Sequence, residues 1–301
     1  MIRRIVTLSL TLLCISSAHN GFQIGFYKMS SDALRSADFK IGMEVWVKEL
    51  ARNHDIHTHV RYYSDPKKLY EDFRDGAINM AVATPLVFVK YFDTSLMLPG
   101  IVGFKTSKEK SSQTLLLVRK EDISKPLKNM LQRTVAVSKL ADSGKLYVRY
   151  LGLKHGIETP IRFLETKNGG QAILKLFFGK SDVAITSQAT YDIARELNPQ
   201  VGERIVPYKR VDLPIGSYAY IRKGIDPRLY DDIIRYSLQI PETTRGKQVL
   251  VMFQTDTVET CTLKDLETTR RLYQEYTKLK RNDSGKSSDP RNEKLQRTDT
   301  Q

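Results

Sequence analysis

The stretch VSKLADSGKLYVRYLG, residues 137–152, joins a β-branched run to a helical pattern through small and polar residues. The helical pattern starts at about Ser143, so unpaired backbone N–H groups and the positive end of the helix dipole would converge at this junction. Helix starts of this kind bind anions without covalent chemistry. Asp142 stands in the middle of the junction, where an anionic ligand would meet a fixed negative charge. The stretch therefore predicts a ligand site that is not built for phosphate.

Two roles are open for Asp142. Asp is a preferred N-cap residue, and a capping carboxylate would stabilise the helix by about 1 kcal/mol relative to Ala. Alternatively, the carboxylate would face a ligand in a cleft. In either role its charge opposes an anion, because two unit charges at ~4 Å and an effective dielectric constant near ~20 repel by about 4 kcal/mol. That repulsion would remove most of a micromolar affinity.

Other candidate residues stand at the ends of predicted strands. In open α/β sheets the ligand crevice lies beyond the carboxyl ends of the strands, and helices that start there direct N–H donors into it. We expect the ligand-binding residues to be Tyr27, Thr84, Ser138, Asp142, Ser143, Gly144, Asn168, Gly169 and Ser187.

Strand-like and helical patterns alternate along the chain and must position these residues. Strands are predicted at 22–27, 57–63, 78–83, 114–120, 134–138, 161–164 and 182–186, and helices at 38–53, 65–76, 84–91, 143–155, 170–178 and 188–197. This alternation predicts an α/β protein with parallel sheets and helices on both faces.

One internal similarity divides the chain into two lobes. TLLLVRKEDIS, from Thr114, is echoed by SYAYIRKGIDP, from Ser217, although chance could produce such a match between two amphipathic strands. If both are hinge strands that cross between lobes, residues 19–113 and 217–280 form lobe 1 and residues 114–216 form lobe 2. Residues 281–301 are polar and are expected to be a disordered tail.

The first residues have the pattern of a secretory signal peptide. Arg3 and Arg4 precede the apolar run 5–15, and the small residues at 16–18 predict cleavage after Ala18. The run is too short to cross a bilayer, which takes about 20 residues, and bulky Leu13 disfavours lipid modification of Cys14. Residues 1–18 are therefore expected to be removed on export, leaving a monomeric periplasmic protein.

The composition excludes several function classes. The chain has 301 residues and a formal charge of +14, which falls to +12 without Arg3 and Arg4, yet it contains no nucleic-acid-binding motif. Cys261 is alone once Cys14 is removed, so no intramolecular disulfide is expected. The histidines of HDIHTH, residues 54–59, lack further metal ligands, and no catalytic motif is present. We predict neither catalytic residues nor a metal or cofactor.

At this point the chain resembles the phosphate/phosphite/phosphonate substrate-binding proteins of ABC importers, which have the periplasmic-binding-protein type II fold. The resemblance is carried by residues 65–92 (DPKKLYEDFRDGAINMAVATPLVFVKYF), by the two hinge-like strands, by VAVSKLADSGKLYVRYLG and by GGQAILKLFFGKSDVAI. It implies two lobes that close on a small ligand, no chemistry on that ligand, and a membrane importer permease as partner.

The departures from the family pattern lie in the ligand pocket. Ala141, Asp142 and Ser143 stand where phosphonate-binding members resemble Ser-Thr-Ser, Ala83 replaces a tyrosine, and Gly169 replaces a histidine. These changes predict a diverged pocket. A ligand-sensing partner of a membrane receptor, such as a kinase or cyclic-nucleotide synthase, is the alternative function, and an enzyme on the same fold is less favoured.

Overall fold

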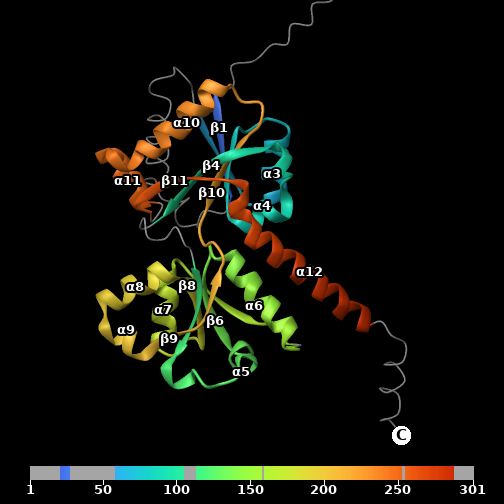
Figure 1. Ribbon diagram of the computed structural model, residues 1–301, viewed down its shortest axis with the longest axis vertical. Helices are drawn as coiled ribbons and strands as arrows, with labels where there is room; N and C mark the ends of the chain where they lie inside the picture. The colour runs from blue at the N-terminus through green and yellow to red at the C-terminus, as the bar shows by residue number, and fades with distance from the viewer. Residues whose placement is uncertain (1–20, 28–57, 105–112, 158, 253–254, 288–301) are drawn as a thin grey trace, which may run out of the picture.

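The computed structural model describes residues 21–27, 58–104, 113–157, 159–252 and 255–287, and these form two β-sheets, each covered by helices on both faces (Figure 1). The α/β class and the two-lobed organisation predicted from the sequence are confirmed. The signal peptide predicted at 1–18 and the helix predicted at 38–53 lie outside the described residues.

The first lobe is built on a six-stranded mixed sheet with the order β11-β4-β10-β3-β1-β2. Its strands are β1 (Phe22–Tyr27), β2 (Thr58–Tyr63), β3 (Met80–Ala83), β4 (Met97–Phe104), β10 (Tyr218–Arg222) and β11 (Thr257–Cys261). Strand β1 is parallel to β2 and β3, whereas β10 is antiparallel to both β3 and β4. The parallel arrangement predicted from the sequence therefore holds for β1–β3 and not for the rest of this sheet.

Helices cover both faces of the first sheet. Helices α3 (Pro66–Arg74) and α4 (Pro85–Tyr91), with η1 (Thr94–Leu96), lie on one face, and α10 (Pro227–Gln239), η4 (Ile240–Glu242) and α11 (Thr244–Met252) lie on the other. Local sequence sets the start of α3, because Asp65 accepts a hydrogen bond from the backbone N–H of Lys67 at 2.9 Å and Pro66 occupies the first helical position.

The second lobe is built on a five-stranded sheet with the order β7-β6-β8-β5-β9. Its strands are β5 (Gln113–Arg119), β6 (Thr134–Ser138), β7 (Arg162–Thr166), β8 (Val183–Ser187) and β9 (Ile205–Asp212). Its helices are η3 (Lys120–Asp122), α5 (Leu127–Leu131), α6 (Asp142–Lys154), α7 (Gly169–Phe177), α8 (Gln188–Leu197) and α9 (Pro199–Arg204). Strands β6, β7 and β8 are parallel, so the helices that follow them start at one edge of the sheet.

The two segments predicted as hinge strands are regular members of the sheets. Strand β5 pairs along its length with β8 and β9, and β10 pairs with β3 and β4. One described connection between the lobes, residues 213–217, lies just outside β10.

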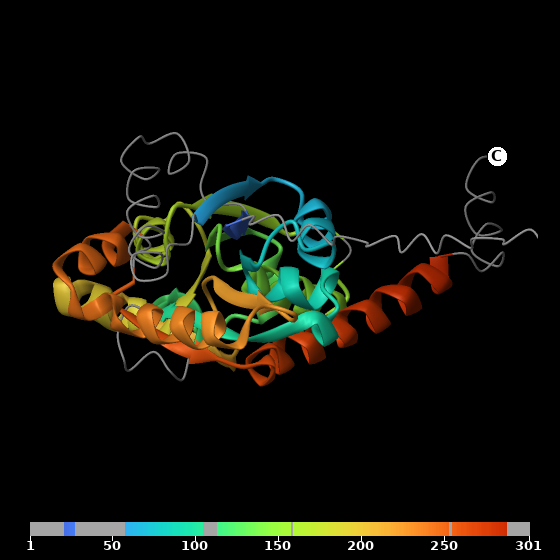
Figure 2. The ribbon, with the colours of Figure 1, turned by 90° about the horizontal axis from the view of Figure 1, so that it is seen from above.

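The C-terminal helix α12 (Glu267–Ser287) contacts both lobes. It follows η5 (Leu263–Leu266), whose Leu266 is in the core of the first lobe, and its own Leu272 is in the core of the second. Beyond these contacts the helix projects from the body of the protein (Figure 2). It ends seven residues after the predicted boundary at 280, although Asn282, Asp283, Ser284 and Gly285 are weak helix formers.

Within the described part of the chain, no helix is both long and apolar enough to cross a membrane.

Candidate functional site

Three helices of the second lobe start side by side at one edge of its sheet. Strands β7, β6 and β8 are neighbours in that order, and they lead into α7, α6 and α8 respectively. The edge therefore brings together Ser138, Asn168 and Ser187, which the sequence predicted as ligand-binding residues. Each of these side chains lies at a strand end, where parallel sheets form their ligand crevices.

Two of these side chains cap the helices that follow them. Asn168 Oδ1 accepts a hydrogen bond from the backbone N–H of Gln171 at 2.9 Å, and Ser187 Oγ accepts one from the backbone N–H of Thr190 at 3.2 Å. Asn168 and Ser187 thus each use a side-chain oxygen to cap the helix that follows. The amide nitrogen of the Asn168 side chain is not engaged in this cap.

Asp142 is the first residue of α6, not its N-cap. Ala141 occupies the N-cap position and makes no side-chain capping bond, so the capping role considered for Asp142 is not observed. Instead, Asp142 Oδ2 accepts a hydrogen bond from the Thr84 hydroxyl at 3.2 Å. This bond connects the two lobes, because Thr84 follows β3 of the first lobe.

Thr84 itself stands at the start of a helix. It is the N-cap of α4, yet its hydroxyl makes no capping bond, and its side chain is buried. The Asp142 carboxylate therefore lies at the N-terminus of α6 and contacts the residue that begins α4. Both helix ends carry partial positive charge, which stabilises a carboxylate at this point. The arrangement places a negative charge of the protein itself at the helix start that the sequence marked as a ligand site.

Ser143 and Gly144 lie beneath the C-terminal helix. Ser143 is 1% exposed, and its hydroxyl lies 3.4 Å from the hydroxyl of Thr269 in α12. A Cβ atom at Gly144 would lie 2.7 Å from Ile185 Cγ2, so glycine lets the first turn of α6 pack closely on β8. The structure thus gives both residues packing roles at the base of the site.

The first lobe contributes Tyr27 at the end of β1, next to Tyr63 in the parallel ladder. Tyr27 is half-buried. It lies within electrostatic range of Lys90 in α4, whose pKa is raised mainly by a hydrogen bond with Tyr91 and further by Tyr273 and Tyr27. Sequence analysis did not identify Lys90, because only the fold places the end of α4 beside β1 and α12.

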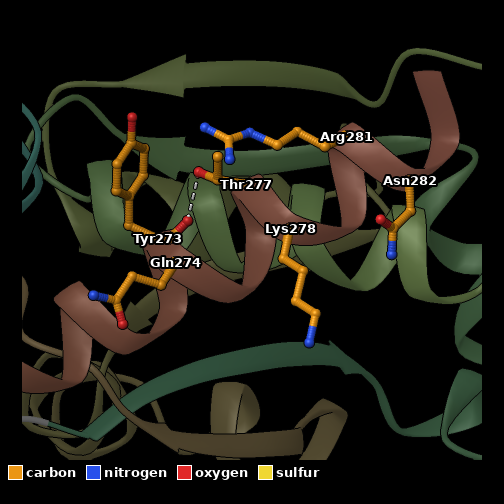
Figure 3. Close-up of a pocket in the computed structure, with 6 residues that line it drawn as sticks. All are labelled: Tyr273, Gln274, Thr277, Lys278, Arg281 and Asn282. Atoms are coloured by element: carbon orange, nitrogen blue, oxygen red, sulfur yellow. Dashed lines mark hydrogen bonds between the residues drawn. The ribbon is translucent and has the colours of Figure 1, made fainter. Parts of the chain in front are cut away.

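A surface cavity of about 490 Å³ lies along α12 (Figure 3). Its described lining residues all belong to α12: Tyr273, Gln274, Thr277, Lys278, Arg281 and Asn282. The Tyr273 hydroxyl and the Arg281 guanidinium lie on the same side of the helix, whereas Lys278 points away from them. None of the predicted ligand-binding residues lines this cavity. Elsewhere in the described part of the chain, no cluster of three His, Cys, Asp or Glu side chains could hold a metal ion.

Comparison with known proteins decides the family. Residues 34–266 match the family model described as the periplasmic phosphonate substrate-binding protein of an ABC transporter. The chain belongs to this family. The sequence resemblance noted above is thereby confirmed, and the family is one of substrate-binding receptors. No curated protein matches the sequence.

Solved structures share the fold of this phosphonate-family chain at low sequence identity. PhnD1 from Prochlorococcus marinus, in complex with methylphosphonate, has a TM-score of 0.60 and 13% identity over 86% of this chain and 99% of that one. XAC2383 from Xanthomonas citri, bound to ATP, has a TM-score of 0.59 and 15% identity over 86% and 98%. A phosphonate-transporter binding protein from Pseudomonas aeruginosa has a TM-score of 0.54 and 13% identity over 89% and 100%.

At one position where the family resemblance implies a different residue, the structure has a close contact. Gly169 stands where the family resemblance implies a histidine, and a Cβ atom there would lie 2.3 Å from Thr186 Oγ1. Thr186 is 2% exposed, so its side chain has little room to move. A histidine at position 169 would have to displace the Thr186 side chain.

Proposed function

We propose that this chain is a periplasmic solute-binding protein that closes on a small ligand other than phosphate or a simple phosphonate and delivers it to a membrane importer permease. The family membership supports the receptor role. The observation that carries the ligand assignment is the position of Asp142, whose carboxylate accepts a hydrogen bond from Thr84 between two helix N-termini.

Electrostatics sets the expected selectivity. A phosphonate seated at the N-terminus of α6 would lie within a few ångströms of Asp142. At ~4 Å and an effective dielectric constant near ~20, the repulsion is about 4 kcal/mol, or roughly a thousandfold in affinity. The two hydroxyl donors that the family pattern would supply at positions 141 and 142 are also missing.

The same carboxylate defines what the site favours. A carboxylate only accepts hydrogen bonds, so it pairs with a hydroxyl, an amide N–H or an ammonium group. Asn168 and Ser187 lie on the same sheet edge and offer further polar groups for orienting a small ligand. We infer a polar ligand that carries a hydrogen-bond donor or a positive charge toward Asp142.

Ligand binding would be coupled to closure of the lobes. A ligand shifts such an equilibrium only when it binds the closed form more tightly than the open form. The Thr84–Asp142 bond is made only when the two lobes meet, so a ligand that bridges the same two residues would favour closure. The connection at 213–217 would accommodate the motion.

Calorimetric titration with methylphosphonate tests the ligand assignment. The unmodified protein should show no binding in the micromolar range. The double variant Ala141→Ser/Asp142→Thr should gain affinity, because it removes a charge and restores two hydroxyl donors at a helix N-terminus. Asp226→Thr is the matched control, since it removes one carboxylate at the N-cap of α10 in the first lobe and should change nothing. Submicromolar binding by the unmodified protein would refute the proposal.

A further inference from the structure

Helix α7 exposes apolar side chains on the face that points away from its sheet. Its inner face, Ala172, Ile173 and Leu176, is fully buried against the second lobe. Its outer face carries Gln171, Leu174, Lys175 and Phe178, at the spacing of one helical stripe. Leu174 is 45% exposed and Phe178 is 66% exposed. Two large apolar side chains of this stripe are therefore left in contact with solvent.

The end of the helix holds Phe178 between two lysines. Gly179 adopts a positive φ of 69°, and the backbone N–H of Lys180 donates to the carbonyl of Lys175 at 2.8 Å. This turn brings the backbone of Lys180 back to that of Lys175. The two lysines therefore flank Phe178 along the chain. Neither lysine has an ion-pair partner among the described residues.

The charged side chains of this segment have one sign. Residues 166–181 contain Lys167, Lys175 and Lys180 and no Asp or Glu. The exposed face of α3 differs, because it carries Glu71 together with Lys67 and Lys68 and shows no large apolar side chain. Exposed apolar side chains beside lysines are the pattern of a surface that binds anionic lipid headgroups, with the apolar groups in the headgroup–acyl boundary.

We propose that the outer face of α7 (Gln171, Leu174, Lys175 and Phe178, with Lys180) is a docking surface for an anionic lipid membrane. Helix α7 starts at the strand-end edge of the second lobe and runs away from it, so Phe178 lies at the end of this lobe that is remote from the ligand residues. Docking there would hold the receptor at the membrane surface. The ligand residues at the strand-end edge would not be covered by the lipid. The inference does not depend on which ligand the protein binds.

Flotation of the mature chain with lipid vesicles tests the proposal. The protein should float with vesicles of phosphatidylcholine and phosphatidylglycerol, and far less with phosphatidylcholine alone. Lys175→Gln/Lys180→Gln should weaken this binding by about thirtyfold, because each lysine near an anionic surface contributes about fivefold. Leu174→Ser/Phe178→Ser should weaken it by about tenfold or more, through lost apolar burial.

Matched variants separate this surface from general basicity. Lys128→Gln/Lys278→Gln removes the same charge from exposed positions elsewhere, and Ile123→Ser removes another exposed apolar group of the second lobe. Both should float like the unmodified protein. The proposal is overturned if the unmodified protein does not float, or if the α7 variants float as well as the controls. It is also overturned if sedimentation shows a dimer that only the α7 variants abolish, since a second copy would then cover this face.

Discussion

The hydrogen bond between Thr84 and Asp142 joins the two lobes, and its energy can be measured by a double-mutant cycle. A hydrogen bond to a charged group contributes about 1.5–3 kcal/mol. The oxygen–oxygen distance of 3.2 Å is long for a hydroxyl donor, and Asp142 is only half-buried. We therefore expect Thr84→Val and Asp142→Asn to show a coupling energy of about 1 kcal/mol in urea unfolding. The cycle is needed because Asp142 has other interactions besides this bond.

Additivity would refute this reasoning. If the free-energy changes of the two single variants sum to that of the double variant within about 0.3 kcal/mol, the lobes are not joined through this pair. Tyr63→Phe combined with Asp142→Asn is the control cycle. The Tyr63 hydroxyl donates to Asp72 within the first lobe, at 2.7 Å, and this pair of substitutions should be additive.

Three further predictions follow from the contacts. Leu272→Ala should lower the free energy of unfolding by about 2–4 kcal/mol, since Leu272 anchors α12 in the core of the second lobe, and a loss below about 1 kcal/mol would contradict that anchoring. Burial raises the pKa of the Cys261 thiol to about 12, so iodoacetamide at pH 8 should label it only after unfolding; rapid labelling of the native protein would show that the thiol is accessible. Lys125 and Arg119 hold the pKa of Asp122 below its usual value, so this carboxylate stabilises the fold above its unfolded-state pKa and the stability is lost as the pH falls through its folded-state pKa. Asp122→Asn should therefore destabilise the protein at neutral pH but not in acid, as measured by urea unfolding at both pH values.

Much of the α/β framework could be read from the sequence. The predicted bounds of β1, β6 and α8 coincide with the observed ones, and α6 and α7 begin one residue early. These elements have continuous apolar runs or helical spacing, and residues such as Ser187 cap the helix starts.

The antiparallel strands β4, β9 and β11 could not be read in this way. Strand β4 contains Pro99, Gly100 and Gly103, which interrupt a strand pattern. A Cβ atom at Gly100 would lie 1.8 Å from the backbone oxygen of Ala219 in β10, so glycine is required by a close approach between the two strands. Ala219 follows Gly100 by more than one hundred residues, and the constraint is invisible in local sequence.

The position of the candidate residues at a sheet edge could be predicted, but their contacts could not, for the same reason. Strand ends and helix starts located Asp142, but its partner Thr84 is 58 residues away and belongs to the other lobe. Ser143 likewise has the pattern of a ligand donor, whereas the structure buries it against Thr269, 126 residues later. Local spacing identifies which residues reach the edge of a sheet, and tertiary contacts decide what those residues face.

Native mass spectrometry of the protein purified from its own periplasm tests the central claim most directly, because it weighs the ligand that the closed lobes retain. We predict a retained small molecule without phosphorus, bearing a hydroxyl, amide or ammonium group, which is lost in Asp142→Ala and kept in the control Asp226→Ala. A retained phosphate or phosphonate, or a ligand that Asp142→Ala holds as well as the unmodified protein does, would contradict the account.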